Sequence, residues 1–396
     1  MSSSPPGQQP PNPWASTAAP PQPARPSPTP VDVPAPKRPR LAGIDIARGL
    51  AIIGMFAAHL GDDTESGADD PAWLMIFDGR SAALFAFLAG VSLALSTGRQ
   101  HPPTGAALVR ARLKIFYRAL LLVLLGVVLI AMGTPVVVIL PAYGLMFVLT
   151  LPFLGGDRVT VLLGAGITAI ISPIVIFALT TPLDHGERSI VGAWLDVEDP
   201  VHWTYEIAAT GYYPALIFCA YILVGLAVGR STLTSTSFQA CMVAVGSALA
   251  ALAWGSSRLL LEYDVGQASP LVDRLIRGGP HEYSPVEIVG SCGTSLAVTG
   301  LLLLITRPGA VGRVVAAVLS PLGAAGAMSL TVYSLHIVVI ALLGDDVVWY
   351  PESNAVLIGF VVVSLAASWA WRRWIGTGPL EQLLKVVVSA AVGERR

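Results

Sequence analysis

Three ionisable residues lie on one apolar stretch, RLAGIDIARGLAIIGMFAAHL, and are the clearest sign of chemistry in this chain: Asp45, Arg48 and His59. Charged groups inside a membrane-spanning helix are costly, so they usually have a function. Asp45 and Arg48 are three residues apart and neighbour each other on a helix. Arg48 and His59 are three helical turns apart, so they point the same way, about 16 Å apart along the axis. The spacing predicts a charged pair and an imidazole on one helix face.

These residue types suit acid–base chemistry beside an anion. Arg48 would offer a planar fork to a phosphate or carboxylate, and Asp45 would orient it. His59 would take a proton from a hydroxyl nucleophile near neutral pH. The structural alternatives are an ion pair that fixes neighbouring helices and a histidine that faces lipid headgroups.

Other polar residues are expected near His59. Asp78 and Arg80 open the next apolar stretch, and a short connection brings them close to His59. His281 lies in a loop on the same expected side of the membrane and would complete the polar site. The alternative for Asp78 is a structural one, since a negative charge suits a helix N-terminus. The alternative for His281 is an ordinary polar loop residue, and for His281 this is the simpler interpretation.

A late stretch, MSLTVYSLHIVVI, carries its own polar stripe. Ser329, Tyr333 and His336 follow helical spacing and share one face. Polar groups in spans avoid lipid, so this face is expected to point into the bundle. It would either contact substrate or form hydrogen bonds between helices.

Composition places these residues in a membrane protein. The chain has 396 residues, of which 54% are hydrophobic and 12% charged, against roughly 25% charged in soluble domains. Repeated apolar stretches reach the length of about 20 residues that a span needs. The predicted fold is an all-α polytopic helix bundle in the lipid bilayer. The net charge of -1 says nothing about nucleic acid, but the chain has no basic patch interleaved with aromatic residues, so no nucleic-acid partner is expected.

About ten spans are expected, followed by a short amphipathic helix at 379–391. The spans are expected near 42–60, 80–97, 115–132, 135–154, 159–180, 211–229, 238–255, 286–305, 321–343 and 354–371. Residues 1–40, rich in proline and serine, are predicted to form a disordered cytoplasmic tail, and residues 41–391 the transmembrane domain.

The distribution of charge orients the spans. Lysine and arginine gather in every second loop, as in Lys37, Arg38 and Arg40 and again across 99–118, whereas aspartate and glutamate gather in the others. The positive-inside rule then predicts a multi-pass protein of the cell membrane with both termini in the cytoplasm.

Missing motifs narrow the function. The sequence has no phosphate-binding loop, no HExxH zinc helix and no GxSxG elbow, which disfavours a nucleotide hydrolase or a metalloprotease. Its three cysteines, Cys219, Cys241 and Cys292, lie in apolar stretches without a CxxC pair. They predict neither a disulfide nor a metal site.

Four motifs resemble the YeiB-like family of bacterial membrane proteins, a domain-of-unknown-function family. They are IDIARGLAIIGM, GYYPALIFCAYILVGLAVGR, GAMSLTVYSLHI and GTGPLEQLLK, in the family's order across about residues 40–390. The family is grouped with heparan-alpha-glucosaminide N-acetyltransferase-like and acyltransferase-3-like proteins. The resemblance implies transfer of acyl groups, typically from acyl-CoA, to sugars or lipids of the cell envelope.

The acyltransferase-3-like signature, an arginine followed eleven positions later by a histidine, is matched by Arg48 and His59. Two positions depart from the YeiB-like pattern. Many members carry another polar residue in place of His59, and Gln382 stands where the family usually has tryptophan.

The leading hypothesis is a membrane acyltransferase without a metal. Acyl-CoA would dock on the cytoplasmic side near Arg48 and the basic 99–118 loop, and His59 would activate an envelope glycan or lipid acceptor. Catalysis is assigned to His59, Arg48 and Asp45, and substrate binding to Asp78, Arg80, His281, Tyr333 and His336. The alternatives are a transporter of a small anionic or amphiphilic molecule, favoured by Pro141, Pro152 and Pro173 within spans, and a non-catalytic scaffold.

Overall fold

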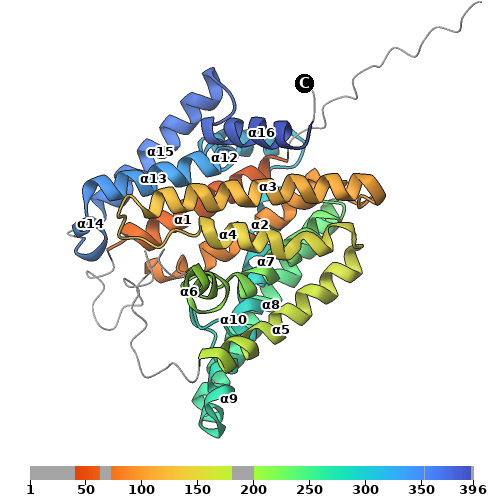
Figure 1. The fold of residues 1–396 in the computed structure, drawn as a ribbon, viewed down its shortest axis with the longest axis vertical. Coiled ribbons are helices and arrows are strands. Elements are labelled where there is room, and N and C mark those ends of the chain that lie inside the picture. The colour runs from red at the N-terminus through yellow and green to blue at the C-terminus, as the bar shows by residue number, and fades with distance from the viewer. Residues whose placement is uncertain (1–40, 63–72, 181–199, 352, 394–396) are drawn as a thin grey trace, which may run out of the picture. The chain divides into compact units, whose positions relative to one another are not determined.

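The computed structural model describes residues 41–62, 73–180, 200–351 and 353–393, and the expected tail at 1–40 lies outside them. The described residues form helices and turns without a β-strand (Figure 1). Within these described ranges, six helices are long and apolar enough to cross a membrane, and the number of candidate spans rises to eight if each of two bent helix pairs counts as one span. The predicted all-α polytopic bundle is confirmed.

The six long helices account for six of the expected spans. They are α1 (Ala42–Leu60), α3 (Gly105–Ile130), α5 (Arg158–Thr180), α8 (Thr236–Glu262), α10 (Pro285–Ile305) and α15 (Ala355–Trp374). Three shorter apolar helices lie at further expected spans: α2 (Arg80–Ser96), α4 (Leu140–Thr150), which continues as the 3₁₀ turn η2 (Leu151–Gly155), and α13 (Ser329–Leu343).

The two bent pairs are broken helices. The segment α6 (Pro200–Tyr205) and the π-helical turn η5 (Glu206–Thr210) meet α7 (Ala215–Gly229) at 53°, and α11 (Ala310–Val318) meets α12 (Ser320–Ala327) at 66°. The remaining elements are short: η1 (Trp73–Ile76), η6 (Val265–Ala268), α9 (Pro270–Ile276), α14 (Asp346–Trp349) and the amphipathic α16 (Pro379–Ala391). The expected bounds of α16 are confirmed.

Two sequence predictions about these elements were wrong. The basic loop expected at 99–118 is helical from Gly105 onward, because arginine and lysine are good helix formers whose stems cover apolar surface. The ninth span, expected as one helix, is divided at Met328, whose φ of -116° and ψ of 32° interrupt the helix between α12 and α13.

Glycines let the helices approach closely, as in other membrane bundles. On the crossing of α2 and α7, a Cβ on Gly90 would collide with the Ile222 carbonyl, and one on Gly225 with the Phe87 carbonyl. On the crossing of α1 and α12, Gly326 lies against the Asp45 carbonyl in the same way. The packed helices therefore fix the height of Asp45 and Arg48 in the bundle.

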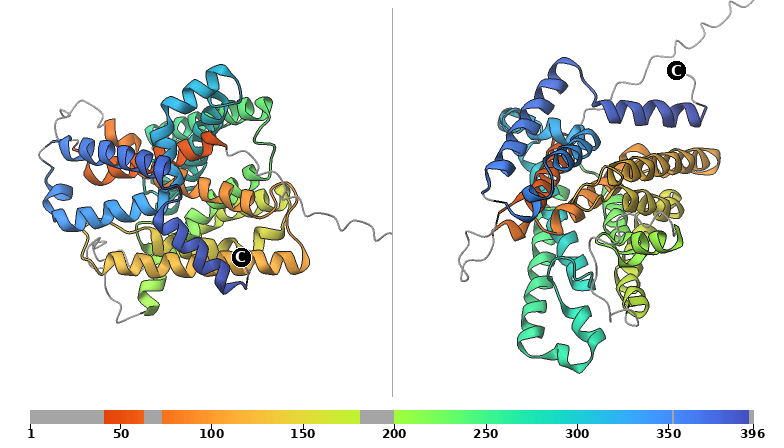
Figure 2. Two further views of the ribbon diagram at one scale, coloured as in Figure 1. Left: turned by 90° about the horizontal axis from the view of Figure 1, so that it is seen from above. Right: turned by 60° about the vertical axis from the view of Figure 1, so that its left-hand side comes forward.

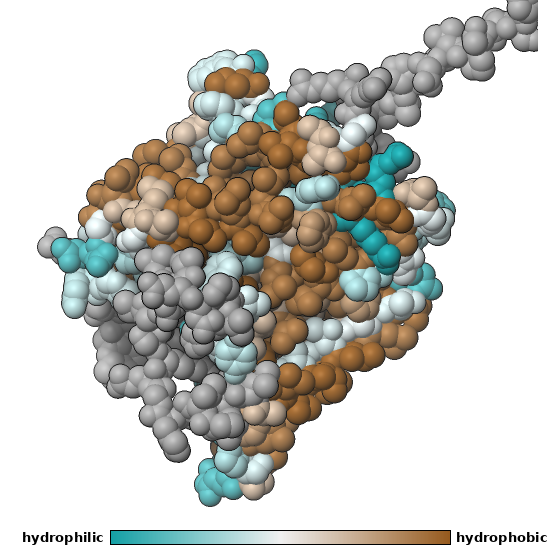
Figure 3. Space-filling model, in the orientation of Figure 1, coloured by the Kyte–Doolittle hydropathy of each residue, from teal (hydrophilic) through white to brown (hydrophobic). Residues whose placement is uncertain are grey.

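The outer helices present apolar side chains, as expected for a surface that meets lipid. Exposed valines, leucines and isoleucines continue along α3, α5 and α15, and apolar residues cover much of the face in Figure 3. By contrast, α8 and α10 pack side by side, with α9 at one end of the pair (Figures 1 and 2). Most of the polar residues discussed below lie on inner helix faces and on the turns between helices; Arg118 on α3 is exposed.

Candidate functional site

Arg48 is held by partners on two helices. Its guanidinium donates to the Asp45 carboxylate at 3.0 Å, the i,i+3 contact that the spacing predicts. Its other terminal nitrogen donates to the Ser92 hydroxyl on α2. Both members of the ion pair keep about a fifth of their side chains exposed, at 20% and 19%. Arg48 is therefore positioned by neighbours while part of it stays open to a ligand.

A second arginine, Arg118 on α3, lies within electrostatic range of Arg48. It interacts electrostatically with Arg48, with Tyr143 on α4 and with Glu381 on α16. Its guanidinium lies 5.9 Å from the Phe147 ring centre, and its side chain is exposed. Two neighbouring guanidiniums repel each other, so an anion bound near both would be stabilised.

Glu381, in the terminal GPLE motif, caps α13. Its Oε1 accepts the backbone N–H groups of Leu330 at 2.7 Å and Thr331 at 3.1 Å, and its Oε2 accepts the Thr331 hydroxyl at 2.6 Å. A carboxylate at a helix N-terminus satisfies free N–H groups and suits the helix dipole. The motif thus ties α16 to the helix that carries Tyr333 and His336.

His59 and His336 form a pair across α1 and α13. His59 Nδ1 lies 3.3 Å from His336 Nε2, and the rings stack with centres 5.5 Å apart. His336 is 2% exposed, whereas His59 is partly exposed. One of the two facing nitrogens has to carry the proton of the shared hydrogen bond. His59 is therefore the member that a substrate can reach.

Tyr333 and Phe56 fix the His336 ring. Their ring centres lie 4.9 Å and 4.8 Å from that of His336. The Tyr333 hydroxyl accepts the backbone N–H of Ile139 at 3.1 Å, just before α4 begins. Within the described part of the chain, His336 Nδ1 is buried without a hydrogen-bond partner. Tyr333 therefore positions His336 and links it to α4.

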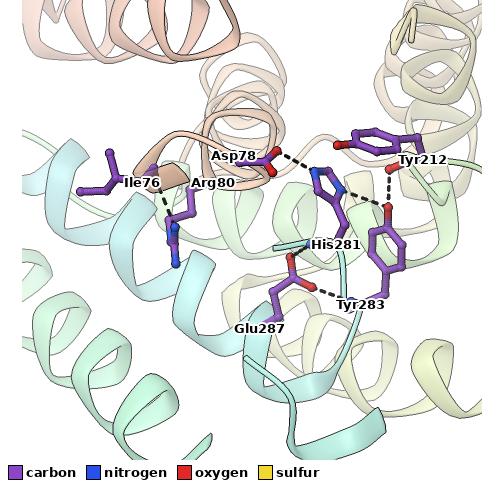
Figure 4. A network of polar contacts seen from close by, with 7 residues as sticks. All are labelled: Ile76, Asp78, Arg80, Tyr212, His281, Tyr283 and Glu287. Carbon is purple, nitrogen blue, oxygen red and sulfur yellow. Dashed lines mark hydrogen bonds and ion pairs between the residues drawn. The ribbon is translucent and has the colours of Figure 1, made fainter. Parts of the chain in front are cut away.

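A second polar network joins the start of α2 to the turn before α10 (Figure 4). His281 Nε2 lies 2.9 Å from the Asp78 carboxylate, and its Nδ1 lies 3.1 Å from the Tyr283 hydroxyl. Burial disfavours the charged form of Asp78, but the hydrogen bond and charge of His281 outweigh it and lower the pKa of Asp78. Tyr283 donates in turn to the Tyr212 carbonyl at 2.5 Å. Both ring nitrogens of His281 are thus engaged.

Glu287 supports this turn from α10. Its carboxylate accepts the backbone N–H of His281 at 3.0 Å and that of Tyr283 at 2.5 Å. Both residues have left-handed backbones, with φ of 59° and 55°, a conformation that costs of order 1–3 kcal/mol in a non-glycine residue. A buried carboxylate therefore stabilises an otherwise unfavourable turn that presents His281 to Asp78.

Arg80, which was expected near His59, contacts other residues. Its guanidinium lies 4.6 Å from the Trp254 ring centre and contacts the Ile76 carbonyl at 3.5 Å. In Figure 4 it points away from His281. Arg80 interacts electrostatically with Asp78 and Glu287, so it contributes to the charge balance of this network.

The two polar groups lie within electrostatic range of each other, because Asp78 interacts with His59. The structure therefore brings together most of the residues that the sequence singled out. It also adds Glu287 and Glu381, which the sequence analysis did not assign to a site, and it identifies Arg118 as the residue of the basic 99–118 segment that interacts with Arg48. One signal pointed to Glu287: Ser284 and Glu287 have capping-box spacing, and Ser284 Oγ accepts the Glu287 N–H at 2.9 Å.

Comparison with known families gives two matches that together cover most of the chain. Residues 40–267 match the family described as heparan-alpha-glucosaminide N-acetyltransferase, catalytic. The chain belongs to this acetyltransferase family. Residues 278–391 match a protein of unknown function (DUF418), the YeiB-like family. The predicted YeiB-like family and its relation to the heparan-alpha-glucosaminide N-acetyltransferases are thereby confirmed. The acyltransferase-3-like signature of Arg48 and His59 stays a prediction. No curated protein matches the chain.

The contacts described above join the two matched regions. His59 and Asp78 lie in the acetyltransferase-family region, whereas their partners His336 and His281 lie in the DUF418 region. The chain is a multi-pass membrane protein with an acyltransferase-like catalytic domain. No group of three or more histidine, cysteine, aspartate or glutamate side chains suited to a metal ion occurs among the residues described.

Proposed function

We propose that this protein transfers an acyl group from acyl-CoA to an envelope sugar or lipid, with His59 as the general base. The observation that carries the proposal is the contact of His59 with His336 at 3.3 Å, which joins the two family regions. A buried, ring-packed histidine beside a partly exposed one is a suitable way to hold a catalytic imidazole.

The donor would bind at Arg48 and Arg118. Acyl-CoA carries several phosphate groups, and planar guanidiniums bind phosphate through paired hydrogen bonds. Asp45 and Ser92 hold Arg48 in position, so the Arg48 side chain loses little conformational entropy when the donor binds. Since Asp45 contacts Arg48, it is a positioning residue in this proposal.

The rise of α1 sets the distance that the acyl group has to cover. Arg48 and His59 are about 16 Å apart along the helix. The pantetheine arm of coenzyme A is extended and would span this distance, which brings the thioester to His59 while the phosphates stay at the arginines.

Transfer would follow the ordinary course of general-base catalysis. As the acceptor oxygen or nitrogen attacks the thioester carbonyl, His59 Nε2 takes its proton. The C–S bond then breaks, and the coenzyme A thiolate receives the proton. For Nε2 to accept, Nδ1 has to carry hydrogen and donate to His336 Nε2, which the contact distance allows. His336 thus selects the useful tautomer of His59.

The acceptor would lie near the Asp78 and His281 network. Asp78 keeps 37% of its side chain exposed and offers a carboxylate to acceptor hydroxyls. The Tyr212 ring, 4.0 Å from that of His281, adds an aromatic surface. Tyr333 and His336 would act through His59, because packing and a hydrogen bond hold them inside the bundle.

The test uses purified protein in proteoliposomes with radiolabelled acetyl-CoA and an envelope extract. Label should appear in a lipid or glycan fraction, and cells lacking the protein should lose the same acylated species. If coenzyme A is never released and no envelope species changes, the proposal is wrong.

A transporter of a small anionic molecule remains the second candidate, because two bent helix pairs, at 53° and 66°, resemble the broken helices of transporters. The assay separates the two functions. A transporter would move its substrate into proteoliposomes chemically unchanged and would need no acyl-CoA.

A further inference from the structure

An apolar groove of about 220 Å³ lies between α3, α4 and the α6–η5 segment. Leu120 and Val123 of α3 form one wall, Pro141 and Val148 of α4 the second, and Ile207 of the π-helical turn part of the third. None of the described residues that line it is charged. The groove is smaller than a typical ligand pocket of about 300–1,000 Å³, so it suits a slender apolar chain better than a bulky ring system.

The groove follows the helices. Its walls run from Phe116 to Val123 on α3 and from Pro141 to Val148 on α4. The two helices are antiparallel, since Gly126 lies against Pro141 and Gly144 against Ala119. Seven residues of helix extend about 10 Å. An occupant would therefore lie along the membrane-spanning helices, in the direction of lipid acyl chains.

The open side of the groove lies beside exposed apolar side chains of the candidate span α3, as expected for a surface that meets lipid. Leu120 is 54% exposed, and Leu124, one turn further along α3, is 59% exposed. Apolar side chains continue across this face (Figure 3). A groove on such a surface is filled from the bilayer, which supplies alkyl chains.

One end of the groove lies close to the histidine pair. Pro141, in the α4 wall, is two residues from Ile139, whose N–H donates to the Tyr333 hydroxyl at 3.1 Å. Tyr333 packs against His336, which contacts His59 at 3.3 Å. A lipid chain in the groove would therefore end within a few side chains of the proposed general base.

We propose that this groove holds the alkyl chain of a lipid-linked acceptor and directs its polar head towards His59. The identification of the bound lipid as an acceptor rests on the proposed acyl transfer, whereas the binding of an alkyl chain in the groove does not. The acceptor is then an amphiphile that reaches the site sideways from the bilayer.

Binding is tested by photo-crosslinking in lipid nanodiscs. The probe is phosphatidylglycerol with a diazirine midway along one acyl chain. Label should map to the α3 and α4 peptides that line the groove. Leu120→Trp fills the groove and should remove most of this label, whereas the matched control Leu124→Trp, outside the groove on the same exposed face, should keep it. Val148→Phe, on the opposite wall, gives an independent variant if Leu120→Trp does not fold.

Equal labelling of all these proteins would overturn the proposal, because it would mean contact with ordinary surrounding lipid. Absence of label from wild-type groove peptides would also overturn it, because another segment or a second copy then covers the groove. A transfer assay with decyl and methyl glucosaminide separates the two proposals. Leu120→Trp should raise KM severalfold for the decyl compound and leave KM for the methyl compound unchanged. If wild-type protein transfers an acyl group to neither compound, the proposed function is wrong. The crosslinking result then decides by itself whether the groove binds an alkyl chain.

Discussion

At the scale of single residues, Arg48 shows how far local spacing carries a prediction. The i,i+3 spacing predicts its contact with Asp45, and that contact is present at 3.0 Å. Its neighbour Arg118 was counted only as a basic residue of a loop. The nearness of Arg118 to Arg48 depends on the packing of α3 against other helices, which no spacing within α3 reports.

The two arginines should contribute to donor binding in the same way. Arg48→Lys and Arg118→Lys should each weaken acyl-CoA binding about tenfold, because a point charge replaces a planar fork. Isothermal titration with purified protein measures this, and Arg313→Lys on the exposed face of α11 is the control. If both variants bind as wild type does, the arginines only support the fold.

At the scale of elements, the sequence predicts apolar helices well and their interruptions poorly. The bounds of α2, α10 and α16 were close to those expected. The division of the ninth span at Met328 was not predicted, because its residues are apolar on both sides of the break. The cap that Glu381 places on α13 joins residues about fifty positions apart, beyond the range of any helical pattern.

This cap should stabilise α13. Glu381→Gln should cost about 1 kcal/mol of stability, as losses of helix caps commonly do, and should also lower transfer, because α13 carries His336. Thermal unfolding in detergent gives the first quantity. Lys385→Gln, one turn further along α16, is the control, and equal behaviour of the two variants would argue against a role for the cap.

The crossing of α1 with α12 should be equally sensitive. A Cβ on Gly326 meets the Asp45 carbonyl, whereas one on Gly359 of α15 meets nothing within 4 Å. We expect Gly326→Ala to lower both the unfolding temperature and acyl-CoA binding, because it displaces Asp45 and Arg48. Gly359→Ala should change neither. A Gly326→Ala protein that unfolds and binds normally would mean that the two helices can separate without loss.

At the scale of the whole molecule, composition alone identifies an all-α membrane protein, but pairing across the chain needs the fold. His59 and His336 are 277 positions apart, and Asp78 and His281 are 203 apart. The sequence marks each as a polar residue in or beside an apolar stretch. Only packing decides that each contacts the other.

The orientation of the bundle is a prediction from loop charge. With Cys219, Cys241 and Cys292 replaced by serine, single cysteines at Gly105 and Ala390 should react only after the membrane is made permeable. A cysteine at Val265 should react with an impermeant maleimide in intact cells. The opposite pattern would reverse the proposed donor and acceptor sides.

The central claim is that His59 performs the proton transfer while Arg48 and Arg118 hold the donor. The most direct measurement compares acyl-CoA binding and the transfer rate in His59→Ala and His336→Gln. Both variants should bind acyl-CoA as wild type does. His59→Ala should lose about 10²–10⁴-fold in turnover, and His336→Gln should lose less. Full turnover by His59→Ala, or failure of wild-type protein to bind acyl-CoA, would contradict the account.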